Sequence, residues 1–130
     1  MQSENQLEMI ILQMQKRYTR LAEVLRLTQD LDDAWKRNDR ESADMLIQMR
    51  GQEMDEISVM NEDIAYRICG LPQVHQTAIE CRLYTDDDKE IKRICELKER
   101  SQNILQRARE IDHRMNMRVA GEHSYYAQQK

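Results

Sequence analysis

The feature that most constrains this chain is an apolar repeat, in steps of three and four residues, that runs from Leu7 to Trp35 without a Gly or a Pro. That spacing places the apolar side chains on one side of an α-helix. The repeat comprises Leu7, Ile11, Met14, Tyr18, Leu21, Leu25, Thr28, Leu31 and Trp35. It predicts a first helix over residues 4–37, roughly 50 Å long at about 1.5 Å per residue.

Two later stretches carry the same kind of repeat and predict two more long helices. One, over residues 40–69, contains Ala43, Leu46, Ile47, Met54, Ile57, Ile64 and Ile68. The other, over residues 87–119, contains Ile91, Ile94, Leu97, Ser101, Ile104, Leu105, Ala108, Ile111, Met115 and Val119. Gly51 lies inside the second helix, where it predicts a bend or a close helix contact.

The boundaries follow from residues that end or begin helices. Asn38 and Asp39 favour the end of the first helix and the cap of the second. Gly70, Leu71 and Pro72 predict a corner, because Pro lacks a backbone donor and disfavours helix at the residue before it. A short helical segment is expected over residues 73–84. Thr85 and the three Asp residues after it predict the start of the last helix, and Gly121 its end, with a flexible tail over residues 121–130.

The composition agrees with an all-helical fold. Three Gly, one Pro and no Phe leave few residues for turns or for a sheet. Because the first connection is short, the second helix must double back along the first. We therefore predict an all-α fold: one domain over residues 1–130, built as an elongated antiparallel bundle of three long helices with a short helical segment between the second and third.

Charge and hydropathy argue against two classes of partner. Residues 39–69 have eight acidic and three basic side chains, a net charge of −5, and residues 89–118 have nine basic and five acidic ones, a net charge of +4. Two oppositely charged helices side by side explain this better than a nucleic-acid surface. In the basic segment Glu residues alternate with the Lys and Arg residues, and no aromatic residues lie between them. No apolar run reaches the roughly 20 residues that span a bilayer, and the N-terminus does not resemble a signal peptide. A cytoplasmic protein is expected, with no nucleic-acid partner and no membrane insertion.

The residues that carry chemistry form no convincing site. Glu110 and His113 have the Glu-x-x-His spacing of di-iron bundles, but the motif occurs once where two copies are needed. The cysteines Cys69, Cys81 and Cys95 suit neither a disulfide framework nor a zinc knuckle and are interpreted as reduced, small apolar residues. The sequence predicts no catalytic residue, no cofactor and no metal.

A helical enzyme of the chorismate mutase type is an alternative, since such chains bind a dianion through Arg and Lys inside the bundle. Arg17, Arg20 and Arg26 flank the first apolar stripe, whereas Arg50 falls within the second. A buried unpaired Arg is unfavourable, so Arg50 is expected to pair with an acid across the bundle or to lie at its edge.

Methionines cluster at two places in the sequence. Met45, Met49, Met54 and Met60 lie in the second helix, where we interpret them as filling gaps in the core. Met115 and Met117 lie near the end of the last helix, which is expected to extend beyond its neighbours and to expose an apolar face suited to a partner.

The layout of the chain resembles the FlgN-type flagellar (type III) export chaperones. The resemblance lies in the hairpin LAEVLRLTQDLDDAWKRNDRESADMLIQMRGQEMDEISVMNEDI, residues 21–64, and in ELKERSQNILQRAREIDHRM, residues 96–115. It concerns helix lengths and the position of the break.

The resemblance implies a non-enzymatic cytoplasmic chaperone that binds helical segments of hook-associated or other exported flagellar proteins before export. It also implies that the partner binds at the C-terminal helical region. This chain itself is expected to be a monomer or a homodimer. The implied partner-binding residues are Leu105, Ala108, Ile111, Met115, Met117, Val119, Tyr125 and Tyr126. The alternative outside this family is a self-associating coiled-coil structural or adaptor protein.

Overall fold

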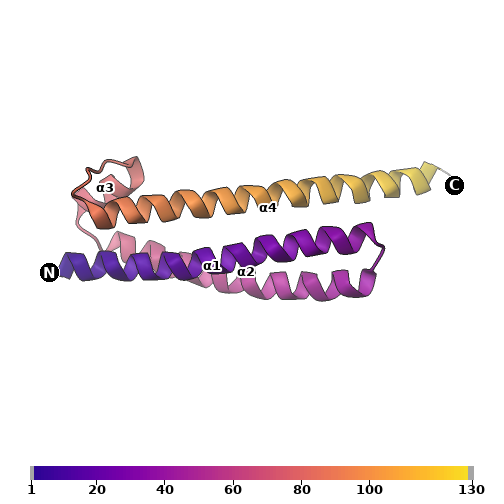
Figure 1. Ribbon diagram of the computed structural model, residues 1–130, viewed down its shortest axis with the longest axis horizontal. Coiled ribbons are helices and arrows are strands. Elements are labelled where there is room, and N and C mark those ends of the chain that lie inside the picture. Colours follow the sequence, from indigo (N-terminus) through magenta and orange to yellow (C-terminus); the bar gives the residue numbers. More distant parts are fainter. Residues whose placement is uncertain (1, 129–130) are drawn as a thin grey trace.

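The computed structural model describes the backbone of residues 2–128 and the side chains of residues 5–121. Within this part of the chain it is all helical: α1 (Gln2–Lys36), α2 (Arg40–Cys69), α3 (Gln73–Cys81) and α4 (Lys89–Gln128). The three long helices form an elongated bundle, and α3 lies at the end that holds the N-terminus (Figure 1). The predicted all-α class is confirmed. None of the described helices has an apolar stretch long enough to cross a bilayer.

The central helix of the bundle is α1, which packs along its length against both α2 and α4, while α2 and α4 contact each other little. Residue numbers rise along α1 as those of its partners on α2 fall, in the pairs Arg17 with Asn61, Arg20 with Glu53 and Thr28 with Arg50. In contrast, α4 runs in the direction of α1. Leu7 shares a core cluster with Ile91 at one end, and Asp32 pairs with Arg118 at the other.

The turn between α1 and α2 is built as the sequence predicts. Asn38 adopts a left-handed conformation with φ of 57°, which ends α1. Asp39 then caps α2, because its carboxylate accepts a hydrogen bond from the backbone N–H of Ser42 at 3.1 Å. Two adjacent residues thus end one helix and begin the next.

The second corner ends α2 at Cys69 and begins α3 after Pro72. Leu71 is buried in the core, so the corner is fixed by packing as well as by the proline. The segment expected over residues 73–84 is helical only to Cys81. Arg82 takes a left-handed conformation with φ of 56°, and its backbone N–H donates to the carbonyl of Ala78.

The last helix begins and ends later than predicted. Thr85 does not cap α4; instead its backbone N–H and hydroxyl both donate to the carboxylate of Asp88, and the helix begins at Lys89. Gly121 does not end it, because a glycine stops a helix by adopting positive φ and Gly121 does not. The backbone of α4 instead continues past the α1–α2 turn to Gln128 (Figure 1), through most of the expected tail, whose last residues, 129 and 130, lie outside the described part.

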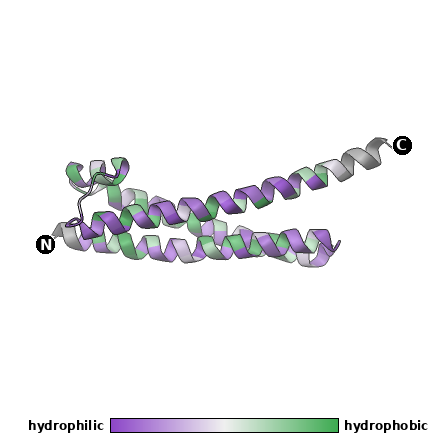
Figure 2. Ribbon diagram, turned by 45° about the horizontal axis from the view of Figure 1, so that its top comes forward, coloured by the Kyte–Doolittle hydropathy of each residue, from purple (hydrophilic) through white to green (hydrophobic). Residues whose placement is uncertain are grey.

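Most of the buried residues form three clusters along the bundle. The largest lies at the α3 end and includes Ile10, Met14, Ile64 and Ile94. The cluster at the α1–α2 turn contains Leu31, Ala34, Ala43 and Met115. The middle cluster has only Leu21, Val24 and Ile57 as buried members. In Figure 2 hydrophobic and hydrophilic residues alternate along the ribbons of the long helices. The middle cluster is thus the smallest of the three.

Candidate partner-binding groove

A groove of about 500 Å³ runs along the middle of the bundle between α2 and α4, with α1 at its base. This volume falls in the range of about 300–1,000 Å³ that is typical of ligand pockets. Its apolar lining comprises Met14, Leu21, Val24 and Leu105 with several residues of α2, including Met54, Ile57, Ile64 and Ile68. The walls therefore offer apolar surface over several helical turns.

Three of the side chains that line the groove walls are small, which leaves space between the larger ones. Ser58 and Ala65 on α2 and Ser101 on α4 reach only a short distance from their helices. Ile79 of α3 lines one end of the groove, and an ion pair between Arg50 of α2 and Asp112 of α4 lies beyond the other.

Arg17 is the unusual polar residue of this groove. Its guanidinium Nη1 donates to the side-chain oxygen of Asn61 at 3.0 Å, and no carboxylate among the described residues lies within 4.0 Å of it. Its Nε and the hydroxyl of Ser101 are buried without a hydrogen-bond partner in the described part of the chain. Burial also lowers the pKa of the Arg17 guanidinium.

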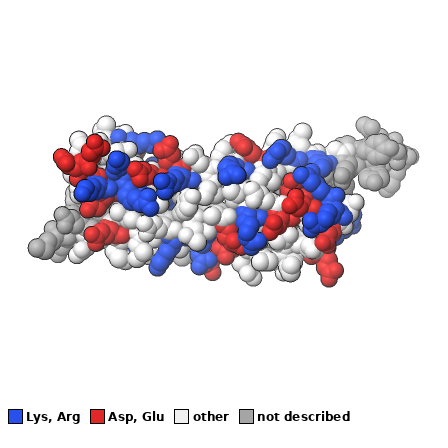
Figure 3. Space-filling view, viewed as in Figure 1, with Lys and Arg blue, Asp and Glu red and all other residues white. Residues whose placement is uncertain are grey.

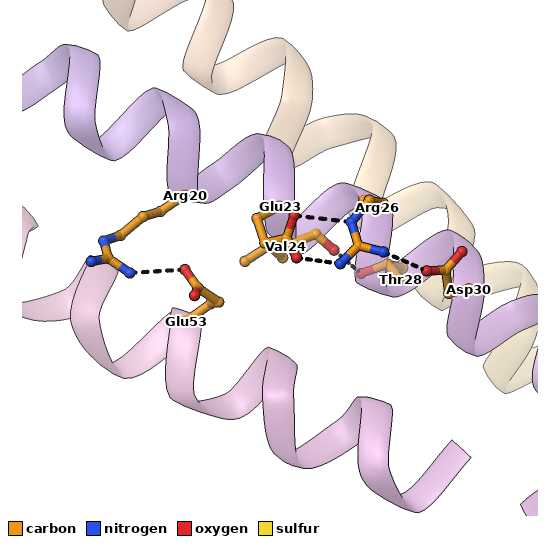
Figure 4. Close-up of polar contacts among 7 residues, drawn as sticks. All are labelled: Arg20, Glu23, Val24, Arg26, Thr28, Asp30 and Glu53. Atoms are coloured by element: carbon orange, nitrogen blue, oxygen red, sulfur yellow. Dashed lines mark hydrogen bonds and ion pairs between the residues drawn. The ribbon is translucent and has the colours of Figure 1, made fainter. Parts of the chain in front are cut away.

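Unlike Arg17, the neighbouring arginines Arg20 and Arg26 of α1 form ion pairs with acidic side chains. Arg20, one turn away, pairs with Glu53 at 3.1 Å and also with Glu56. Figure 4 shows Arg20 reaching across to Glu53 on α2, and Arg26 lying between Glu23 and Asp30 on the surface of α1.

The position of Arg17 corrects the expectation that it flanks the apolar stripe. Because α1 contacts two helices, its buried surface is wider than one stripe. A second repeat with the same steps of three and four runs through Ile10, Met14, Arg17, Leu21, Val24, Thr28 and Leu31. Arg17 lies between Met14 and Leu21 in this repeat and is half-buried, and the spacing that reveals this is visible in the sequence.

The residues that the family resemblance implied for partner binding do not share one exposed face. Ala108 and Met115 are both 4% exposed, and Met115 packs against Leu31, Ala34 and Ala43 of the other two long helices. In this structure neither is available to a partner.

The other implied partner-binding residues differ in exposure. Leu105, Ile111 and Val119 are half-buried, and Leu105 lines the groove. Met117 is 62% exposed. The side chains of Tyr125 and Tyr126 lie outside the described residues.

The methionines of α2 are not core residues, contrary to our interpretation. Met45, Met49 and Met54 are all exposed, and Met54, at 51%, lines the groove, while Met60 is half-buried. Gly51 makes no close helix contact either, because a Cβ built on it meets nothing within 4 Å.

The sequence candidates for chemistry lie apart from the groove. Glu110 and His113 are exposed on α4, and no group of three potential metal ligands occurs among the described residues. Cys95 is buried, and desolvation raises the pKa of its thiol, with Lys98 and Arg82 opposing this in part. Cys69 and Cys81 are exposed, so only one cysteine fits our interpretation of them as small apolar residues.

Arg50, considered above as an anion-binding residue, forms an ion pair with an acidic side chain of this chain, Asp112. Its Nη1 lies 2.7 Å from Asp112 and 3.3 Å from the hydroxyl of Thr28. The surface charges are likewise mixed: on the face in Figure 3, Lys and Arg side chains along α4 are interspersed with Asp and Glu.

No protein-family model, curated protein or solved structure matches this chain significantly. The functional proposal therefore rests on the shape and lining of the groove.

Proposed function

We propose that the protein is a non-enzymatic chaperone that binds an amphipathic helix of another protein in the groove between α2 and α4. The observation that supports this proposal is a largely apolar groove along the middle of a bundle of three long helices, lined by residues of all three. A fourth helix is the usual element that completes such a bundle, and an amphipathic helix in an apolar groove is a recurrent mode of recognition.

The length of the groove sets the length of the bound helix. On α2 its lining extends from Met54 to Ile68. At about 1.5 Å per residue this corresponds to roughly 20 Å, or about four helical turns. A segment of about 14 residues with an apolar side would cover it.

Met54 suits this role. Its side chain is flexible and polarizable, so it adapts to apolar side chains of different shapes. A chaperone that binds more than one client benefits from such a surface.

The resemblance to FlgN-type chaperones makes hook-associated and other exported flagellar proteins the first clients to test, in the cytoplasm before export. In our proposal the client's helix occupies the groove. Only Leu105 among the residues implied by the resemblance lines it.

The test is coexpression with hook-associated proteins, followed by size-exclusion chromatography. Ala65→Trp places an indole on the groove wall and should abolish co-elution, whereas Ala22→Trp, at an exposed position on α1, should leave it intact. If no hook-associated protein co-elutes at micromolar concentration, the flagellar client is wrong. If the chain alone is a stable dimer that Ala65→Trp separates, the groove is a self-association interface, as expected for a structural adaptor.

A further inference from the structure

We propose that the helix bound in the groove carries an acidic residue on its apolar face, and that this carboxylate pairs with Arg17. This inference rests on the proposed function, because it specifies the chemistry of the helix that the groove accepts.

The first argument is charge. The described residues that line the groove include two cations, Arg17 and Lys98, and no Asp or Glu. Neither cation has an ion-pair partner among the described residues, whereas Arg20, three residues from Arg17, has two. The groove is therefore electrostatically complementary to an acidic helix.

The second argument is desolvation. Arg17 is already half-buried and its one side-chain acceptor is the neutral amide of Asn61. A purely apolar helix laid over it would remove its remaining water and leave a buried charge without compensation, which is strongly unfavourable. A carboxylate from the bound helix would instead make a charge-assisted, bidentate contact with the guanidinium.

The third argument is the pair of unsatisfied polar atoms. Buried polar groups nearly always have a hydrogen-bond partner. Arg17 Nε and Ser101 Oγ have none within the described part of the chain, and both residues line the groove. Both atoms are buried in the unbound protein, and a polar group on the bound helix at the level of Arg17 would offer them a partner if the two side chains turned toward it.

The same charges disfavour a second copy of this chain in the groove. If two copies packed groove against groove about a two-fold axis, Arg17 and Lys98 of one copy would approach those of the other. Like charges at an interface are unfavourable. We therefore commit to a helix of a different protein.

The test uses a fluorescein-labelled, acetylated and amidated amphipathic peptide of 16 residues with Leu along one face. Four versions carry a single Glu, each at a different position of that face, and four matched versions carry Gln. Binding is measured by fluorescence polarisation. We expect at least one Glu peptide to bind roughly tenfold more tightly than its Gln counterpart, since an ion pair in a partly desolvated groove gives about that discrimination.

Variants test whether Arg17 causes the preference for the Glu peptide over the Gln peptide. In Arg17→Gln the Glu and Gln peptides should bind equally, and in the matched control Arg20→Gln the roughly tenfold preference should remain. Arg17→Gln should melt at or above the temperature of the original chain by circular dichroism, because it removes a partly desolvated cation. Arg17→Met serves as a second variant if Arg17→Gln does not fold.

The outcomes separate the two proposals. If Glu and Gln peptides bind equally and Ala65→Trp blocks both, the acidic residue is wrong and the helix-binding groove stands. A preference for Glu that persists in Arg17→Gln also overturns the pairing with Arg17. If no peptide binds and no client co-elutes, both proposals are wrong. A dimer that Ala65→Trp dissociates would assign the groove to a second copy and overturn both.

Discussion

Arg50 of α2 and Asp112 of α4 form an ion pair across the bundle, with 2.7 Å between Nη1 and Oδ1. The same nitrogen donates to the hydroxyl of Thr28 on α1, and that hydroxyl in turn donates to the carbonyl of Val24 at 2.7 Å. One guanidinium thus contacts all three long helices. This junction joins α2 to α4 just beyond the groove, on the side of the α1–α2 turn.

The Asp112→Ala variant should destabilise the protein by about 1–2 kcal/mol, because it leaves the Arg50 side chain, only 19% exposed, without its counter-charge. Urea denaturation followed by circular dichroism measures this loss. The double variant Arg50→Met/Asp112→Ala should recover most of it. The control is Asp63→Ala, which removes a pair with Arg67 within α2 that is more exposed than the Arg50–Asp112 pair and should cost much less. Equal losses in the two single variants would contradict a structural role for the junction.

Met115 and Met117 are two residues apart, but truncation of the first should destabilise the protein much more than truncation of the second. Met115→Ala should cost about 2–4 kcal/mol, because it opens a cavity against α1 and α2. Met117→Ala should change stability by less than about 0.5 kcal/mol, since its side chain is 62% exposed. Urea denaturation of the two variants makes the comparison. Similar values would show that the end of α4 does not pack as described.

The helices and their first boundary could be predicted because they depend on local chemistry. An uninterrupted repeat predicts a helix wherever its neighbours lie, and Asn38 and Asp39 act within a few residues of themselves. Gly121 could not be interpreted in the same way. Glycine ends a helix only if its backbone turns left-handed, which the residue type permits without requiring.

The groove depends on tertiary arrangement, and the sequence reasoning therefore missed it. An apolar stripe in the sequence of one helix does not reveal how many other helices that helix contacts. Because α1 lies between two neighbours, Val24 and Ala34 are buried although they lie outside the predicted stripe. Arg17 enters the groove for the same reason. On α2 the opposite occurs: Ile47 and Met54, which the stripe includes, are exposed because α2 packs along its length against α1 alone.

The three thiols should react at two very different rates with a disulfide reagent such as dithionitrobenzoate. Cys69 and Cys81 are exposed and should react promptly, whereas Cys95 is buried and its raised pKa disfavours the reactive thiolate. Two equivalents of thiol should therefore appear in the native protein and the third only in urea. Cys95→Ala should remove the slow phase, and prompt reaction of all three thiols would contradict the packing of α3 on α4.

Gly51→Ala should stabilise the protein by about 0.5–1 kcal/mol. Gly51 lies inside α2, and an added Cβ meets no atom within 4 Å, so the substitution improves helix propensity without a clash. Gly51→Pro is the opposing control and should cost about 3 kcal/mol or more, because proline breaks the helix interior. Urea midpoints measure both changes. A loss of stability in Gly51→Ala would mean that the glycine serves a contact or a bend that this structure does not contain.

Asp32 should contribute to acid denaturation of the bundle. Desolvation alone would raise the pKa of its carboxyl, but hydrogen bonds and charge from Arg118 and Lys36 outweigh this and lower the pKa below its ordinary value of 3.8. Because the folded state holds the carboxylate form more strongly, its contribution to stability is present in full above the unfolded pKa. That contribution is lost as the pH falls from about 3.8 through the folded value.

Urea titrations of the original chain and Asp32→Asn, at a series of pH values from 7 to 2, would measure this effect. The stability of Asp32→Asn should be lower at pH 7, and the difference between the two proteins should shrink in the most acidic samples. Glu110→Gln, at an exposed carboxylate of α4 with no ion pair among the described residues, is the matched control and should follow the original chain throughout. A difference that stays constant down to pH 2 would show that the link from Asp32 on α1 to Arg118 on α4 does not depend on the ionised carboxylate.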